Sequence, residues 1–169
     1  MKSKPVKPGL IGDEGGDIGI SDETLQKLMR EVLVTGALFR FRARGWSMTP
    51  FIQNGDVITI APVTKEKPGL GKVVAFIQPA SGHLVVHRVI GRQGAGFLIQ
   101  GDNALGQPDG LVSSKDILGC VTRLERNGSR VLLGLGAERY LVAILARNGW
   151  LKAVLRRLRA VKVYFHLSG

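Results

Sequence analysis

A serine in a tight turn is the first residue whose type and setting suit catalysis. Ser47 lies in the hexapeptide 45–50, with the sequence GWSMTP, directly after a stretch that alternates apolar and basic residues. Glycine and proline confine such a segment to a turn, and a turn can expose a hydroxyl as a nucleophile. Serine is also common in ordinary turns, so its position alone leaves both interpretations open.

A histidine inside an apolar strand pattern is the second candidate. His87 interrupts the hydrophobic run 85–90, with the sequence VVHRVI. Neutral imidazole, whose ordinary pKa is about 6.5, can accept the proton of a serine hydroxyl and act as a general base. The alternative is a structural histidine at the edge of the core, with its ring held by hydrogen bonds.

Two acids in glycine-rich turns complete the set. Asp102 lies in the segment 100–103 (QGDN), and Asp109 lies between Pro108 and Gly110. Either carboxylate can accept the second ring N–H of a catalytic histidine and stabilise the imidazolium. Either can equally bond its own backbone in a turn. Serine, histidine and aspartate together indicate acyl-transfer chemistry, although their order along the chain proves nothing, since such triads recur in several orders.

The elements that position these residues are predicted to be mainly β. A helix is expected over 21–35, with Ser21 as its N-cap, Ile20 packing on Leu25 and Gly36 ending it. Residues 39–44 alternate apolar and basic side chains, as in a half-buried strand. Further strands are expected at Val57–Ile60, Val73–Ile77, Leu84–Ile90, Phe97–Gln100, Ile117–Leu124 and Val131–Leu133. Many short strands without intervening helices favour a coiled antiparallel sheet.

Basic charge is concentrated at the C-terminal end. The 169 residues include 24 Lys and Arg and 13 Asp and Glu, for a net charge of +11. Residues 137–169 hold seven of these basic residues and a single acid, Glu138. A basic amphipathic helix is expected over 137–161, interrupted at Asn148–Gly149. Its apolar stripe (Leu141, Ile144, Leu145, Leu151, Val154, Leu155 and Leu158) can pack on the sheet, or the helix can dock on an anionic membrane surface.

The motifs, taken in order, resemble the type I signal peptidase superfamily, which includes the LexA-type repressors. The resemblance covers about residues 39–124 and rests on several segments in the family's order: 45–50 (GWSMTP), 54–57 (NGDV), 71–76 (GKVVAF), 85–90 (VVHRVI), 101–103 (GDN) and 117–119 (ILG). It implies a coiled antiparallel sheet domain of the signal peptidase and LexA type.

The resemblance also assigns roles. Bacterial signal peptidases and LexA-type repressors use a serine and a lysine, but His87 stands at the place of the lysine. This is similar to the archaeal and endoplasmic-reticulum branch, which uses serine, histidine and aspartate. It implies Ser47 as nucleophile, His87 as base, Asp109 as the acid that orients it and Asp102 as a supporting acid. Gly45 stands where the family often has an oxyanion hydroxyl.

The predicted organisation has three parts: a flexible tail at 1–20, a peptidase-like domain at 21–134 and a basic helical segment at 135–169. The resemblance implies an extended peptide substrate that adds a strand beside the site. Trp46, Met48 and Pro50 are expected at the substrate site, with core packing as the alternative for the first two.

Several classes are excluded or disfavoured. One cysteine, Cys120, and three scattered histidines give no zinc-ligand spacing, so no metal and no cofactor are expected. Neither a membrane-spanning run nor a signal peptide is visible, so a cytoplasmic protein, or one peripheral to the cytoplasmic membrane face, is expected. A catalytically idle peptidase-like domain that binds peptides or a partner is the second hypothesis. A DNA-binding regulator is the least favoured, because a single helix precedes the predicted sheet.

Overall fold

The described residues form an antiparallel sheet of eight strands. The computed structural model describes residues 21–104 and 108–157, so the tail predicted at 1–20 and the end of the predicted C-terminal helix lie outside the described residues. The strand order is β1-β2-β7-β3-β4-β5-β6, with β8 pairing on β7. The elements are α1 (Asp22–Val34), β1 (Phe39–Arg42), β2 (Val57–Pro62), β3 (Val73–Ile77), β4 (Leu84–Gln93), β5 (Gly96–Gln100), β6 (Leu111–Val112), β7 (Ile117–Arg126), β8 (Ser129–Val131) and α2 (Arg139–Arg147). The predicted mainly β fold is confirmed.

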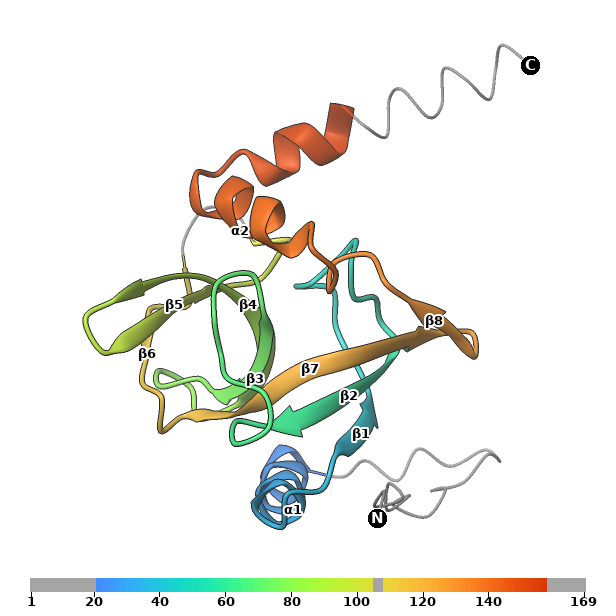
Figure 1. Ribbon diagram of the computed structural model, residues 1–169, viewed down its shortest axis with the longest axis vertical. Coiled ribbons are helices and arrows are strands. Elements are labelled where there is room, and N and C mark those ends of the chain that lie inside the picture. The colour runs from blue at the N-terminus through green and yellow to red at the C-terminus, as the bar shows by residue number, and fades with distance from the viewer. Residues whose placement is uncertain (1–20, 105–107, 158–169) are drawn as a thin grey trace.

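The sheet coils on itself, as Figure 1 shows. Register shifts interrupt the ladders of β2 with β7, β3 with β7, and β4 with β5. Each shift adds an unpaired residue on one strand, which bends that strand and increases its twist. β4 and the loop at 101–103 lie close to the turn that follows β1.

Two strand predictions differ from the structure. The strand expected at Val131–Leu133 lies earlier, at β8, and Leu132 and Leu133 are exposed. Asn127 and Gly128 both have positive φ, 50° and 76°, and form the two-residue turn of the β7–β8 hairpin. β6 is only two residues long, which is too short for an alternating pattern to reveal it.

The N-terminal helix begins and ends close to the predicted residues. The Ser21 hydroxyl accepts a hydrogen bond from Thr24 N at 3.2 Å and caps α1. Met29 and Leu33 are buried against the sheet, together with Phe39 of β1 and Leu124 of β7. Gly36, at φ 79°, follows the end of the helix. None of the described helices combines the length and the hydrophobicity of a membrane span.

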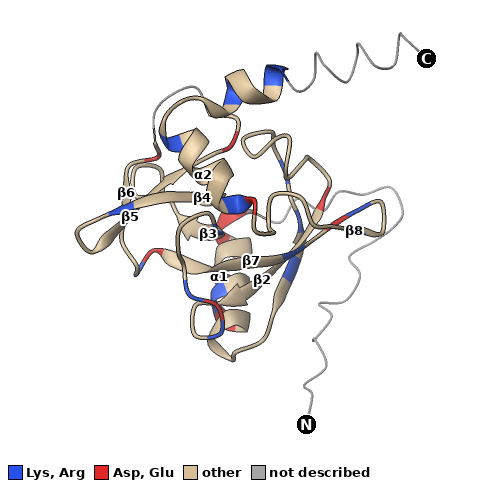
Figure 2. Ribbon diagram, turned by 45° about the horizontal axis from the view of Figure 1, so that its top comes forward, with Lys and Arg blue, Asp and Glu red and all other residues tan. Residues whose placement is uncertain are grey.

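The described part of the C-terminal segment, up to residue 157, forms two short helices. α2 ends at Arg147, and residues 151–157 are again helical, so the predicted interruption at Asn148–Gly149 is confirmed. The buried side of α2 differs from the prediction: Val142, Ala143 and Ala146 are buried, whereas Leu141 and Ile144 of the predicted stripe are exposed. Basic residues mark the last described turns (Figure 2).

Candidate active site

Ser47 is exposed at the start of a turn that follows β1. Thr49 N donates to the carbonyl of Trp46 at 3.2 Å, and Ile52 N donates to the carbonyl of Met48 at 3.1 Å. These bonds give the segment a helical turn, and the buried side chain of Met48 joins the main core. The turn is therefore anchored to the core by Met48, while the serine side chain faces solvent.

Asp56 anchors the loop behind this turn. Its carboxylate is buried, accepts Gln53 N at 2.7 Å and accepts two hydrogen bonds from the Arg126 guanidinium at 2.8 Å each. Burial by itself would raise the pKa of Asp56, but the hydrogen bonds from Arg126 and Gln53 outweigh it and hold the pKa below its ordinary value. The Asn-Gly-Asp segment thus ties the Ser47 loop to β7.

Replacing Asp56 by asparagine is expected to lower the free energy of unfolding by about 1–3 kcal/mol at neutral pH, because charge-assisted hydrogen bonds are lost. The folded-state pKa lies below the unfolded value of about 3.9. The contribution is therefore complete above that value and is lost as the pH falls through the folded-state pKa. Urea unfolding of wild type and Asp56→Asn should differ at neutral pH and converge in strong acid. The exposed control Glu23→Gln should show almost no difference. A gap that stays constant with pH would contradict a role for the Asp56 charge.

His87 and Asp109 form a direct pair. His87 Nδ1 lies 2.5 Å from Asp109 Oδ2, and both side chains are largely buried. Gln78 Nε2 contacts the other oxygen of Asp109 at 3.4 Å, and Asp109 N donates to the carbonyl of Ile99 at 2.8 Å. A carboxylate at Nδ1 selects the tautomer that carries its proton there, which leaves Nε2 free to accept a proton.

Gly101 separates His87 from the Ser47 turn. A β-carbon at Gly101 would lie 2.7 Å from the Ser47 carbonyl oxygen and 3.0 Å from His87 Nε2. His87 Nε2 and the Ser47 carbonyl oxygen therefore lie close together on either side of Gly101, which has no side chain to separate them. In the part of the chain that the structure describes, no hydrogen bond joins Ser47 Oγ to His87. Catalytic hydrogen bonds are often long in the free enzyme and tighten when substrate binds.

Gly101→Ala is expected to reduce any turnover by roughly 100-fold, because the added methyl group must push the Ser47 turn and the His87 ring apart. The accompanying loss of stability should be about 1–3 kcal/mol. Gly69→Ala is the matched control, since a β-carbon there meets no atom within 4 Å. Steady-state kinetics of both variants, with thermal unfolding in parallel, test this expectation. Equal rates for the two variants would contradict it.

Among the described residues, Asp102 makes no hydrogen bond to His87 and instead forms a buried ion pair with Arg88. Arg88 Nε and Nη2 donate to the two oxygens of Asp102 at 2.8 and 2.7 Å, and both side chains have no exposed surface. Arg88 Nη1 also donates to the carbonyls of Gly71 and Gly134. Burial raises the pKa of the Asp102 carboxyl, and the ion pair with Arg88 acts in the opposite direction. The pair links β4 to the loop after β5 and to the C-terminal segment.

Asn103 joins the same loop to the Ser47 turn. Its backbone N–H donates to the carbonyl of Ser47 at 2.7 Å, and its side-chain amide donates to the carbonyl of Trp46 at 3.2 Å. The Gly-Asp-Asn segment therefore has three separate structural roles. Gly101 lets His87 approach the Ser47 turn closely, Asp102 binds Arg88, and Asn103 donates hydrogen bonds to the turn.

The structure brings Ser47, His87 and Asp109 to one region and keeps Asp102 behind it. Of the residues expected at the substrate site, Trp46 is exposed and Pro50 is half-buried, whereas Met48 belongs to the core. Sequence reasoning missed Arg88. The available signal was an arginine inside an apolar strand, since a buried guanidinium requires a carboxylate or carbonyl partners.

Neither a cysteine nucleophile nor a metal site is supported by the described residues. Burial raises the pKa of the Cys120 thiol to about 11, so this residue remains protonated at neutral pH. Across 21–104 and 108–157, no group of three or more histidine, cysteine or acidic side chains is placed to hold a metal ion.

A coiled antiparallel sheet that carries an exposed serine near a buried His–Asp pair defines a serine peptidase-like domain. The chain matches the family described as Peptidase S24-like over residues 15–122, and it belongs to that family. All of the candidate catalytic residues fall inside the matched range. No curated protein matches the sequence.

Proposed function

We propose that the protein is a serine endopeptidase of the signal peptidase type, with Ser47, His87 and Asp109 as its catalytic residues. The observation that carries the proposal is the 2.5 Å contact of His87 Nδ1 with Asp109, with Nε2 turned toward the Ser47 turn. Membership of the Peptidase S24-like family supports serine chemistry. The histidine at the place of the lysine favours the Ser–His–Asp branch.

The chemistry follows from these positions. His87 Nε2 accepts the Ser47 hydroxyl proton as Oγ attacks the scissile carbonyl carbon. The Asp109 carboxylate accepts the hydrogen bond from Nδ1–H of the His87 imidazolium and stabilises its charge. His87 then donates the proton to the leaving amine, which departs and leaves an ester on Ser47. A water molecule, deprotonated by His87, hydrolyses the ester and restores the serine.

The tetrahedral intermediate requires a donor for its oxyanion. Among the described residues, no acceptor occupies the Ser47 N–H, so this donor is available. A side-chain hydroxyl two residues earlier is absent because Gly45 stands there at φ 94°, a conformation that strains residues with a β-carbon. Loss of one oxyanion donor costs about 10²–10³ in rate, so we expect slow turnover.

An extended peptide has two strand edges available beside the site. β1 pairs only with β2 among the described strands, and its chain continues to Ser47. Within the described sheet, residues 84–87 of β4 pair only with β3, since pairing with β5 begins at Arg88. Partly buried apolar side chains of both edges, Phe41 and Val86 among them, pack against the main core. A peptide strand paired to these edges would pass between Ser47 and His87.

The test is cleavage of an unstructured peptide library, read by mass spectrometry, with Ser47→Ala as the control. We expect slow cuts next to small residues with wild type and none with the variant. Equal cutting by both proteins would overturn the proposal.

A catalytically idle peptide-binding domain is the second candidate. Two observations favour it: the lack of a Ser47–His87 hydrogen bond within the described residues, and the bare Gly45. A serine-reactive fluorescent probe separates the candidates, because only an activated Ser47 is labelled faster than surface serines. Labelling of wild type but not of His87→Ala would exclude the idle domain.

A further inference from the structure

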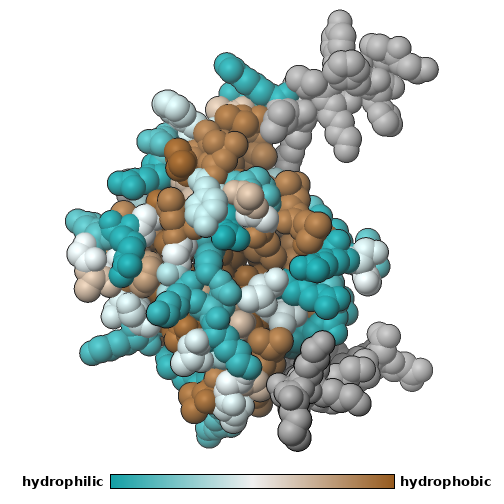
Figure 3. All heavy atoms as spheres, viewed as in Figure 1, coloured by the Kyte–Doolittle hydropathy of each residue, from teal (hydrophilic) through white to brown (hydrophobic). Residues whose placement is uncertain are grey.

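Exposed apolar side chains gather in the C-terminal part of the described chain. Six large hydrophobic residues are exposed between positions 132 and 150: Leu132, Leu133, Tyr140, Leu141, Ile144 and Trp150. Figure 3 shows hydrophobic side chains collected over the C-terminal helices. The other exposed hydrophobic residues, such as Val34 and Leu70, are scattered singly along the chain. Single exposed residues are normal on a protein surface, whereas a cluster marks an interaction site.

α2 is apolar on two opposite sides. One side buries Val142 and Ala146 with Phe51 of the Ser47 turn and with Leu151 of the following helix. The opposite side exposes Tyr140, Leu141 and Ile144, whose spacing of three and four residues places them on one face. A helix that only packs on the sheet would carry polar residues on that outer face. We call Tyr140, Leu141, Ile144 and the adjoining Trp150 the C-terminal apolar face.

The charged residues of this segment are mostly basic. Arg139, Arg147, Lys152, Arg156 and Arg157 lie within 137–157, and Glu138 is the one acid there. The Glu138 carboxylate accepts the N–H groups of Gly134 and Gly136, so it serves its own chain. Figure 2 shows the basic residues on these helices.

We propose that the C-terminal apolar face docks on the surface of an anionic lipid bilayer. Tryptophan and tyrosine suit the water–lipid boundary, aliphatic side chains enter the acyl region, and arginine and lysine bind anionic headgroups. A second copy of the chain is a poorer partner, because it would bring the same positive charge against this face. Nucleic acid would engage the arginines and leave the leucine and isoleucine in water.

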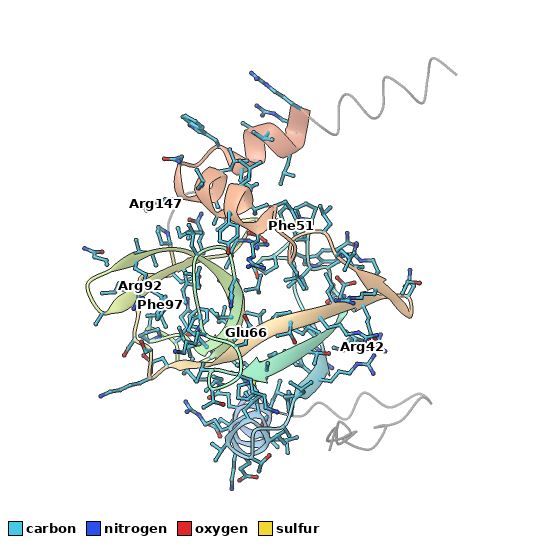
Figure 4. The ribbon with its side chains drawn as sticks, viewed as in Figure 1. Arg42, Phe51, Glu66, Arg92, Phe97 and Arg147 are labelled. Atoms are coloured by element: carbon cyan, nitrogen blue, oxygen red, sulfur yellow. The ribbon has the colours of Figure 1, made fainter. Side chains whose placement is uncertain are left out.

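Docking at this face also positions the candidate site. α2 packs on β4, which carries His87, and on Phe51, four residues after Ser47. Figure 4 shows Phe51 directly beneath the C-terminal helices. The lipid surface would therefore hold the serine turn at a constant height, where it meets peptides that emerge from the bilayer. The docking itself does not require Ser47 to be active.

The experiment uses the full chain with Ser47→Ala, so that binding is measured without cleavage. Sedimentation with vesicles of phosphatidylcholine alone, or with added phosphatidylglycerol, should show binding that needs the anionic lipid and weakens with salt. The double change Leu141→Ser, Ile144→Ser should weaken binding by about tenfold or more. Its matched control is Val34→Ser, an exposed apolar residue on α1.

Two further measurements separate the contribution of the basic residues from the insertion of apolar side chains into the bilayer. Arg147→Glu with Arg156→Glu should abolish binding, whereas Arg42→Glu with Arg130→Glu, the same charge change on the sheet, should reduce it much less. In a Trp46→Phe background, the emission of Trp150 should shift to the blue on vesicle binding. Circular dichroism verifies that each variant is folded.

Three results would overturn the proposal: no binding to anionic vesicles by the folded protein, equal loss with the α2 and control substitutions, or equal binding to neutral vesicles. Self-association in sedimentation velocity that is lost with Leu141→Ser, Ile144→Ser would assign the face to a second copy instead. Peptide cleavage in solution without vesicle binding would retain the proposed peptidase and reject the docking surface.

Discussion

Replacing His87 by alanine is expected to lower kcat on a cleaved peptide by about 10⁴- to 10⁶-fold. The His87 imidazole lies beside the Ser47 turn and is the proposed acceptor of the hydroxyl proton, so its loss removes the general base. Asp109→Asn should cost about 10⁴-fold, because an amide favours the wrong histidine tautomer and does not stabilise the imidazolium. The measurement is single-turnover cleavage at saturating enzyme, with cut sites read by mass spectrometry.

The matched control for this prediction is His83→Ala. His83 is exposed, lies just before the same strand and contacts Asp22 at 3.0 Å, away from the serine turn. Its loss should leave kcat within about a factor of two. Combining His87→Ala with Asp109→Asn should cost little more than His87→Ala alone, since the two residues act as a unit. Additive losses would contradict the assignment of Asp109 as the acid that orients His87.

Breaking the Arg88–Asp102 pair is expected to have the largest effect on stability. Asp102→Asn should lower the free energy of unfolding by about 3–5 kcal/mol, because a buried guanidinium loses its counter-charge. The corresponding fall in Tm is roughly 6–20 °C. Arg88 also donates to two carbonyls, so Arg88→Met should be at least as damaging. Urea and thermal unfolding measure both variants.

The double variant Arg88→Met, Asp102→Leu gives a sharper test of this interpretation. Removing both charges eliminates the uncompensated one, so the double variant should be more stable than Asp102→Asn. Asp116→Asn, a carboxylate outside this pair, is the control and should change stability by about 0.5 kcal/mol or less. If Asp102→Asn proved as harmless as the control, the ion pair would contribute nothing to folding.

Much of the fold could be predicted because its signals are local. Ser21 caps α1 as expected, since a hydroxyl and the N–H three residues later need only the helix turn between them. The alternation in Phe39–Arg42 predicts β1, because the side chains of a strand face opposite sides at every second residue. The Asn148–Gly149 break follows from the low helix propensity of glycine.

The family resemblance implied Asp109 as the partner of His87, but the pairing of Asp102 with Arg88 required the tertiary structure. His87 and Arg88 are adjacent in β4, so their side chains leave opposite faces of the strand. Each therefore meets a different carboxylate, Asp109 for the histidine and Asp102 for the arginine. Both acids lie in glycine-rich turns, and nothing in the residue types alone separates them.

The outer face of α2 is a second example. Leu141 and Ile144 are large apolar residues on one face of α2, and one prediction from the sequence is that this face is buried. The smaller residues Val142, Ala143 and Ala146 form the buried side instead. Small side chains let a helix approach a sheet closely, and the buried side of α2 packs on Ile90 of β4 and on Phe51. Periodicity shows that a helix is amphipathic, but it cannot show how much room its partner leaves.

By itself, the sequence determined the mainly β class, the ends of α1, most of the strand positions and a short set of residues able to carry acyl transfer. These depend on neighbours along the chain and on residue types that match a family. The tertiary structure showed the contact between His87 and Asp109 that the family resemblance implies, and it alone showed that Asp102 pairs with Arg88 and that the C-terminal helices leave an apolar face exposed. Those features depend on register, strand facing and available volume, which arise only when segments far apart in the sequence pack together.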